Sequence, residues 1–324
     1  MTTPTADRVP PGFHEGELAV QRQAGVRGEA ARLSRMLDPA NLSGGAARFL
    51  TNQNLAILSG RDHDGRLWTS PLSGPAGFLE ATDAHTLRVH TTPAPGDPLR
   101  DLDAGQPVAL LVIDFTRPRR FRINGWLAAT ARGLEAGLTI EADQAYGNCP
   151  QYIRQRDLTR DPIGNAGPNN ATRASSVPTD RAQLNDDDIS QVTTADTFFL
   201  GTTHPNRGRD ASHRGGPPGF VRVDDNGHLW WPDYEGNNMF NSFGNLVVDP
   251  TAALLFCDFS TGRTLHLSGT ARVERTDRGA AGDDGGTGRR ASFTVERTRT
   301  GAPLSLRAAH TTEPAEGTRR SSGG

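Results

Sequence analysis

The spacing of apolar residues divides the chain into a helical amino-terminal part and a longer part that predicts β-strands. In Arg27–Leu37 the apolar side chains recur every three or four residues, as they do along one face of an α-helix. Asp38-Pro39 ends this run, because proline cannot continue a helix. We therefore expect residues 1–50 to form an amino-terminal helical segment that covers part of the remaining fold.

From Leu55 onward, short apolar runs are separated by turn dipeptides, a pattern that is typical of antiparallel β-sheets. Leu55–Leu58 precedes Asp64-Gly65, and Phe220–Val223 precedes Asn226-Gly227. Tight hairpin turns favour Asp-Gly and Asn-Gly, because their central positions need a positive φ. The fold class that follows is mainly β with flanking helices.

This β-rich pattern occurs twice in the chain. Gly74–Phe78 returns as Gly216–Phe220 at a shift of 142 residues, and Leu111–Phe115 returns as Leu255–Phe259 at a shift of 144. The difference between the shifts places a two-residue insertion near residues 90–105. Each copy predicts a strand, a hairpin, a strand, a second hairpin, a short helix and two further strands. Five or six antiparallel strands without an edge signal indicate a small closed barrel.

Composition sets the boundaries of the two copies. Residues 157–190 hold few large apolar side chains and many Asn, Asp, Arg and Pro, so they cannot bury enough surface to fold alone. From Gly279 onward Gly, Arg, Thr and Ser dominate, which predicts at most one more strand and then a disordered tail. The predicted segments are the helical segment 1–50, barrel copy one with a following helix 51–156, a linker 157–190, barrel copy two 191–278, and a final strand with a disordered tail 279–324.

The charged residues exclude several classes of protein. All 35 basic residues are arginine, so no lysine can act as an amine nucleophile, form a Schiff base or hold a phosphate in a P-loop. With 37 acidic residues the formal charge is -2, and the chain lacks the basic excess of a nucleic-acid binder. A small-molecule ligand is the partner that this balance favours.

The apolar runs and the cysteines predict a cytoplasmic protein without a membrane partner. The longest apolar run, Val108–Ile113, is far shorter than the roughly 20 residues of a membrane helix, and Met1–Asp7 shows no basic stretch before an apolar one. The two cysteines match no zinc spacing and suit a reducing compartment. Cys149, beside Pro150, is either a redox thiol or a packing residue, and packing is the more common role. Cys257 lies in an apolar strand and is expected in the core.

Two polar patches in copy two carry side chains suited to an anionic group. Ser212, His213 and Arg214 bring a hydroxyl, an imidazole and a guanidinium fork directly before a glycine-rich turn. Downstream, Gly236–Leu246 is rich in asparagine and predicts the start of a helix capped by Asn or Ser, where amide donors and the helix N-terminus favour an anion. The alternative is that these asparagines only satisfy turns. The candidate binding residues of the second patch are Asn237, Asn238, Asn241 and Ser242.

These patches belong to a set of strings that resembles a known family, the pyridoxamine 5'-phosphate oxidase-like, FMN-binding split β-barrel proteins. Phe13–Glu17 narrows the resemblance to bacterial members with two barrel copies, and the resemblance covers about residues 13–278. The strings that carry it are Phe198–Thr202, Asp210–Gly216, Gly236–Leu246, Ala253–Phe256 and Ala145–Ile153.

The resemblance implies two tandem split β-barrels that form an intramolecular pseudo-dimer, with the flavin between the barrels. It implies that the FMN phosphate contacts the second strand and the helix after the third, which here are Ser212–Arg214 and Asn238–Ser242. Copy one lacks the asparagine-rich helix start, so its Trp68, Thr69 and Ser70 are expected to contact the flavin ring instead. The chain is then a monomer with an internal pseudo-dimer, or a homodimer.

Two departures from the family limit what the resemblance implies. Many members place a lysine on the phosphate, and this chain has none, so Arg214 must act there together with Asn and Ser side chains. True pyridoxamine phosphate oxidases end in an arginine-rich motif that recognises the substrate, and Pro303–Arg307 matches it poorly. Pyridoxamine phosphate is therefore not assigned as the substrate, and no catalytic residue is assigned.

Two classes of function remain open. The first is an FMN-dependent oxidoreductase that acts on an unidentified small molecule, with a reductase or a nicotinamide cofactor as electron donor. The second is a non-catalytic carrier of flavin or haem on the same fold, since a fold does not determine a function. His213 and His204 keep haem binding open.

For two further motifs, a binding role was weighed against a purely structural role. His14–Glu17 has no second histidine at helical spacing, which argues against a metal site there. Trp230-Trp231 ends a strand, so one ring is expected in the core and the other outside, where it is able to stack on a flavin or a partner.

Overall fold

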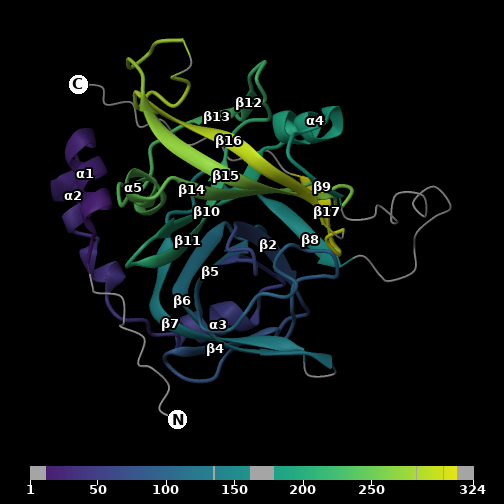
Figure 1. Ribbon diagram of the computed structural model, residues 1–324. Helices are drawn as coiled ribbons and strands as arrows, with labels where there is room; N and C mark the ends of the chain where they lie inside the picture. Colours follow the sequence, from purple (N-terminus) through teal and green to yellow (C-terminus); the bar gives the residue numbers. More distant parts are fainter. Residues whose placement is uncertain (1–11, 134–135, 161–178, 282, 302, 312–324) are drawn as a thin grey trace.

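The computed structural model describes residues 12–133, 136–160, 179–281, 283–301 and 303–311. Two large antiparallel β-sheets lie against each other, one above the other in Figure 1, and the helices lie around them. Among the described residues no helix is both long and apolar enough to cross a membrane.

The first sheet contains seven strands in the order β2-β1-β5-β6-β7-β4-β3. Its hairpins follow the predicted turns, with β1 and β2 joined across Asp64-Gly65. The strands are β1 (Leu55–Arg61), β2 (Leu67–Ser73), β3 (Leu79–Ala81), β4 (Thr86–Val89), β5 (Gln106–Asp114), β6 (Arg119–Ala131) and β7 (Gly137–Asn148).

The second sheet repeats this order as β11-β10-β14-β15-β16-β13-β12, and β9 pairs with β16 outside that path. A two-stranded sheet joins β8 (Arg156–Arg160) and β17 (Leu306–Thr311). The remaining strands are β9 (Thr179–Arg181), β10 (Thr197–His204), β11 (Gly208–Gly215), β12 (Arg222–Val223), β13 (Leu229–Pro232), β14 (Thr251–Cys257), β15 (Thr264–Arg275) and β16 (Arg289–Thr300).

The helices lie at the amino terminus and against the sheets. The first four described helices lie between Glu15 and Thr51, and a helical segment was predicted over residues 1–50. The helices are α1 (Glu15–Ala24), α2 (Arg27–Ala31), the 3-10 helix η1 (Ser34–Leu37), α3 (Gly45–Thr51), α4 (Asp186–Thr194) and α5 (Asn241–Val248).

The same irregularity recurs in both sheets. The strand register shifts at Asn124/Gly125 between β6 and β7, and at Ser268/Gly269 between β15 and β16, which lie 144 residues further on. A Cβ atom on either glycine would lie 2.0 Å from a backbone carbonyl oxygen of the neighbouring strand. Only glycine fits at this close approach, so both copies have kept it.

The central strands are buried on both faces because each sheet packs on its own core and on the other sheet. Leu58 of β1 lies in the core of the first sheet, and Leu200 of β10 occupies the corresponding place in the second. Their neighbours Ile57 and Phe199 point the other way, into an apolar layer that the sheets share. The contacts are reciprocal, since β11 lies against β5 and β6 while β2 lies against β14 and β15.

Several predicted boundaries are wrong. The first sheet has seven strands instead of five or six, since β7 was not predicted, although buried and less buried residues alternate along it. No helix follows β4 among the described residues of copy one, whereas α5 occupies the corresponding place in copy two. After Gly279 the described residues form two strands, β16 and β17, and β16 belongs to the second sheet, so that sheet continues past residue 278. Much of the predicted linker (161–178) and of the predicted tail (312–324) lies outside the described residues.

Candidate functional site

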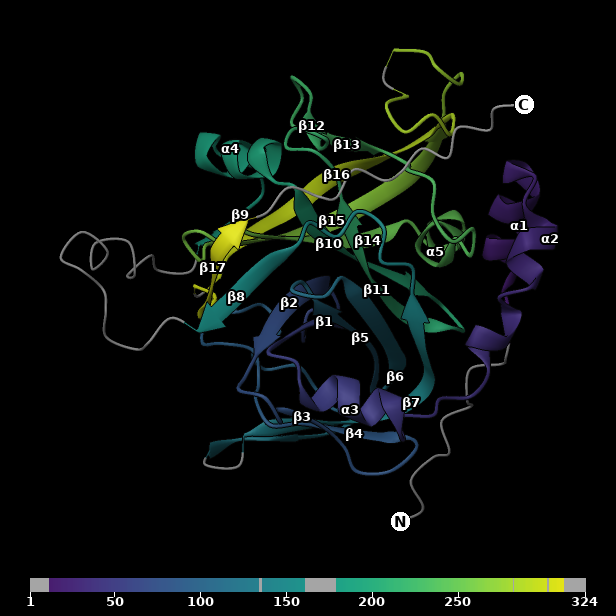
Figure 2. The same ribbon diagram turned by 180° about the vertical axis from the view of Figure 1, so that it is seen from behind.

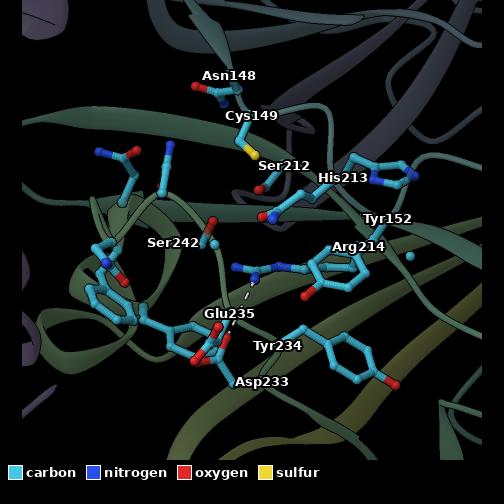
Figure 3. A pocket seen from close by; sticks show the side chains of 18 of the residues that line it. Asn148, Cys149, Tyr152, Ser212, His213, Arg214, Asp233, Tyr234, Glu235 and Ser242 are labelled. Atoms are coloured by element: carbon cyan, nitrogen blue, oxygen red, sulfur yellow. Dashed lines mark ion pairs between the residues drawn. The ribbon is translucent and has the colours of Figure 1, made fainter. Parts of the chain in front are cut away.

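A cavity of about 130 Å³ lies between the two sheets. The first sheet contributes residues of β6 and of the segment after β7, and the second contributes β11, the segment after β13 and the start of α5. Figure 3 shows Arg214 inside this cavity, with its guanidinium beside Ser242 and its ion-pair partner Asp233. Both copies therefore build the site.

Arg122 of β6 is the buried centre of the site. Its Nη1 lies 2.8 Å from Oδ1 of Asp210 on β11, and both side chains are less than 5% exposed. It also donates to the Ala211 carbonyl oxygen (3.1 Å), to the Tyr146 hydroxyl (3.2 Å) and to the Ser212 Oγ (3.2 Å). Burial alone would lower the Arg122 pKa, but the Asp210 carboxylate and Tyr146 beside it raise that pKa above its usual value. This arginine is therefore a fixed cation.

Arg120, two residues earlier on β6, has no carboxylate partner among the described residues. Its guanidinium donates to the carbonyl oxygens of Cys149, Gln151 and His213. Burial, together with the positive charge of Arg122, lowers the Arg120 pKa to about 10. It remains a cation near neutral pH, and only main-chain dipoles and an imidazole offset its charge.

Arg214 is the cation with the fewest partners. Its guanidinium lies over the Phe243 ring at 4.9 Å, and Nη1 is 4.0 Å from Oδ1 of Asp233. Asp233 is already bound by Arg289, whose Nε lies 2.9 Å from Oδ2. Within the described part of the chain, no atom accepts a hydrogen bond from the Arg214 guanidinium, and its Nε is buried without a partner. The Arg214 donors are therefore available to a ligand.

The first turn of α5 lies at the same cavity. Its N-cap is Phe240 with φ 60°, and no side chain caps the turn. The prediction of an Asn or Ser cap is wrong because the Asn241 and Ser242 side chains point inward instead. Asn241 Oδ1 accepts from Arg122 at 3.0 Å, and the Ser242 hydroxyl donates to Asp210 at 2.7 Å. The backbone N–H groups of this turn, rather than its side chains, are left for an anion.

The structure brings the predicted residues of copy two together. They come from β11 and from the segment that leads into α5, which are distant in sequence but face each other across the cavity. The lining residues among them are Ser212, His213, Arg214, Asn237, Asn238, Asn241 and Ser242.

The structure does not bring the predicted residues of copy one to this cavity. The Trp68 ring donates to Asp62 at 2.8 Å, the Ser70 hydroxyl donates to Asp97 at 2.6 Å, and the Thr69 carbonyl oxygen lies 2.9 Å from Nδ1 of His266. β2 packs against β14 and β15, as β11 packs against β5 and β6. It therefore lies at the position that corresponds to the cavity on the other side of the interface, which we call the reciprocal position. Buried side chains bond to one another there. Trp68, Thr69 and Ser70 therefore line the reciprocal position and not the cavity.

The two histidines considered for haem lie apart. The His213 ring packs between Phe115 and Phe199, at centroid distances of 6.2 and 5.9 Å, and burial lowers its pKa well below the usual value. The His204 ring lies 4.4 Å from that of His14, near α1. The two rings therefore have different surroundings and do not face each other as a pair of axial ligands.

A second histidine does approach the His14–Glu17 motif, although it comes from β10 and not from the same helix. One ligand atom from each of His14, Glu15 and His204 lies within 4.8 Å of the others. However, Nδ1 of His14 accepts the Gly16 N–H and Nδ1 of His204 accepts a backbone N–H. The Nδ1 lone pair of each ring is therefore already engaged by a backbone donor and is not offered to a metal ion there.

Sequence reasoning missed the residues that copy one contributes. Arg120 and Arg122 alternate with the apolar Phe121 and Ile123 along one strand, and an arginine at inward-facing positions of a strand is a signal of a buried polar site. Cys149 also lines the cavity. Of the tryptophan pair, Trp231 is buried and lines the cavity, and the half-buried Trp230 lies under Arg222 and Arg290 instead.

Part of the cavity lies in a segment that is similar to a known protein family. Residues 187–285 match the family model Pyridoxamine 5'-phosphate oxidase. The match to this oxidase family includes β11, α5 and all the cavity residues that were predicted in copy two. A search of curated proteins finds no match.

Three solved structures are similar over part of the chain. A candidate pyridoxamine 5'-phosphate oxidase from Lactobacillus delbrueckii is 16% identical, covers 36% of this chain and 94% of its own, and has a TM-score of 0.31. HupZ from Group A Streptococcus is 13% identical, covers 38% and 99%, and has a TM-score of 0.30. The FAD binding protein from Mycobacterium smegmatis is 12% identical, covers 38% and 97%, and has a TM-score of 0.26.

Proposed function

We propose that the chain is an FMN-binding flavoprotein whose cavity between the sheets holds the flavin phosphate. The observation that carries this proposal is the Arg214 guanidinium, which lies beside the uncapped first turn of α5 without a described hydrogen-bond acceptor. A phosphate accepts hydrogen bonds from a guanidinium and from helix N–H groups at once. The oxidase-family match over residues 187–285 supports the same ligand.

The charges around the cavity suit such an anion. Of the four arginines that line it, Arg122 and Arg289 are each in an ion pair with a buried aspartate. Arg120 donates to carbonyl oxygens and an imidazole, and Arg214 lies 4.0 Å from an aspartate that Arg289 already engages. The described lining holds two acids, Asp233 and Glu235, and with Asp210, which pairs with Arg122 from outside the lining, one positive charge remains in excess. In this proposal the excess positive charge replaces the charge of the lysine that many family members place on the phosphate.

A bound FMN would supply the hydride or electron transfer, and the protein would bind it, orient it and exclude water. Arg214 and the α5 N–H groups would hold the phosphate. Arg122, through the bond from Nη2 to the Ser212 Oγ, would keep that hydroxyl in place. Tyr152 and Tyr234, stacked at 5.0 Å on the cavity lining, would restrict the access of water.

We propose one flavin per chain. The position that corresponds to the cavity on the other side of the interface is filled by Ser70, Asp97 and His266, all buried and bonded within the group. A carboxylate at that place repels a phosphate. The reciprocal contacts of the two sheets support two tandem split barrels that form a pseudo-dimer inside one chain, so a monomer is expected to hold the cofactor.

We propose an oxidoreductase that acts on an unidentified small molecule, with a reductase or nicotinamide cofactor as donor. The alternative is a flavin carrier without turnover. Anaerobic addition of a nicotinamide cofactor to the flavin-loaded protein separates the two. Bleaching of the flavin absorption supports the enzyme, whereas an unchanged spectrum with every donor supports the carrier.

Two matched serine variants test the placement of the phosphate. Ser212→Ala removes a hydroxyl at the cavity, and Ser70→Ala removes the corresponding hydroxyl at the reciprocal position. We expect Ser212→Ala to weaken FMN binding about fivefold, as the loss of one hydrogen bond does, and Ser70→Ala to leave it within about twofold. Equal losses in calorimetric titration would overturn the placement.

A further inference from the structure

The amino-terminal helices lie directly on the segment that leads into α5. Figures 1 and 2 show α1 beside α5 from opposite sides, although more than two hundred residues separate them in the chain. The approach is very close, because a Cβ atom on Gly16 would lie 2.1 Å from the Gly244 carbonyl oxygen. Two glycines therefore let the backbone of α1 rest on that of α5.

The segment from residue 236 to residue 240, which we call the entry turn, has an unusual backbone. Asn238 and Phe240 both have φ 60°, a left-handed conformation that side chains other than glycine rarely adopt. Such residues keep this conformation only where their surroundings hold it. The entry turn ends at the uncapped helix N-terminus that faces the cavity, so whatever holds the turn also holds the proposed phosphate site.

Three side chains of α1 and α2 hold the entry turn and the residue after it, and we call them the amino-terminal clamp. Gln21, which is buried, donates from Nε2 to the Met239 carbonyl oxygen at 3.1 Å. Glu29 accepts from the Asn238 amide at 2.9 Å. Glu17, the third member, accepts from the Asn241 amide.

Glu17 connects the clamp to the centre of the cavity. Its side chain is 5% exposed, and its other carboxylate oxygen accepts the His14 N–H at 2.8 Å. The Asn241 amide that donates to Glu17 accepts from Arg122 with its own oxygen at 3.0 Å. The orientation of Asn241, the first residue of α5, is thus determined from α1 on one side and from β6 on the other.

We propose that the amino-terminal clamp preorganises the entry turn, so that α1 and α2 determine the affinity of the site for the phosphate group of its ligand. The identity of the ligand rests on the proposed function; the clamp itself rests on the contacts above. Preorganisation raises affinity because the strained turn is already formed before the ligand arrives. Gln21 and Glu17 are positioning residues, since neither lines the cavity.

Full-length variants with matched controls test the clamp against FMN and riboflavin, which differ only in the phosphate. Gln21→Ala removes the bond to Met239, and Gln23→Ala removes an exposed glutamine of the same helix. Gly16→Ala forces α1 away from α5, and Gly28→Ala adds a methyl group in open space. We expect Gln21→Ala to weaken FMN binding about fivefold and Gly16→Ala to weaken it more, with riboflavin binding and both controls within about twofold of wild type.

The preference for FMN over riboflavin is the readout that a merely structural role would not move. If Gln21→Ala weakens both flavins equally, or leaves FMN binding unchanged, the clamp is wrong. Circular dichroism shows whether the Gly16→Ala protein has folded. If it has not, the test of the clamp rests on Gln21→Ala alone. If the wild type binds neither flavin, the proposed function fails, and inorganic phosphate becomes the probe: weaker phosphate binding by Gln21→Ala supports the clamp, and unchanged binding overturns it.

Discussion

Arg122 of β6 and Asp210 of β11 form an ion pair across the two sheets, with 2.8 Å between Nη1 and Oδ1 and both side chains almost fully buried. This ion pair links the two copies, and it also fixes the position of Arg122 in the cavity. Ser212, Tyr146 and Asn241 all bond to the same guanidinium. The geometry of the cavity therefore depends on the contact between the sheets.

Breaking this pair is expected to destabilise the folded chain strongly. Asp210→Asn leaves the Arg122 charge buried without its partner, which costs about 3 to 5 kcal/mol. Urea denaturation of the ligand-free protein measures this. The control is Arg132→Ala, which removes an ion pair to Asp101 whose two side chains are 77% and 66% exposed, and which should change stability by less than about 1 kcal/mol. Similar small losses in both variants would contradict the structural role.

Arg214→Ala is expected to weaken FMN binding about ten- to a hundredfold, because it removes a charge-assisted contact worth roughly 1.5 to 3 kcal/mol. Arg100→Ala serves as the comparison, since Arg100 bonds within a surface segment of copy one, to Thr92 and the Pro93 carbonyl oxygen. Fluorescence quenching of added FMN gives both dissociation constants. Losses of the same size would show that the phosphate does not lie at Arg214.

The stability of the chain should depend on pH through Glu17. Burial raises the Glu17 pKa to about 7 from a usual value of 4.5. Between these values the folded state binds more protons than the unfolded state, so the contribution of Glu17 to the free energy of unfolding falls as pH rises, by up to about 3 kcal/mol. Burial, followed by the nearby His204 and Arg207, lowers the His14 pKa to about 4, which acts in the opposite direction below pH 6.5.

Glu17→Gln separates the two contributions because it keeps His14 and removes the titrating carboxyl. Unfolding free energies of the wild type and of this variant, measured from pH 5 to pH 8, should diverge up to about pH 7 and then level off, with the wild type losing stability relative to the variant. A constant difference across this range would mean that Glu17 is ionised throughout.

Much of the fold was accessible from the sequence because the duplication is visible in residues that the sheets constrain. Gly125 and Gly269 recur because a carbonyl oxygen occupies the space of a side chain, and Leu58 and Leu200 recur because each lies in the core of its sheet. The strand β7, which pairs with β6 and β4, was not predicted because Ala142 and Gln144 interrupt the large apolar side chains of its buried face.

Of the residues that form the candidate site, only those of copy two were predicted from the sequence. Ser212 and Arg214 stand next to a glycine-rich turn, which is a local signal. The alternation of Arg122 with apolar residues is a signal of a buried polar position, but the sequence does not show which strand of copy one faces β11. The shift of 142 residues pointed to Ser70 instead, which is the counterpart of Ser212 in sequence but lies at the reciprocal position in space.

The most direct test of the account is the stoichiometry of FMN bound by the full-length protein. The ligand-free chain is titrated with FMN by calorimetry, and the visible spectrum of the complex is recorded after removal of free flavin. One FMN per chain, with flavin bands near roughly 375 and 450 nm, is the result that a single phosphate site between the sheets predicts. No bound flavin, or two equal sites per chain, would contradict it.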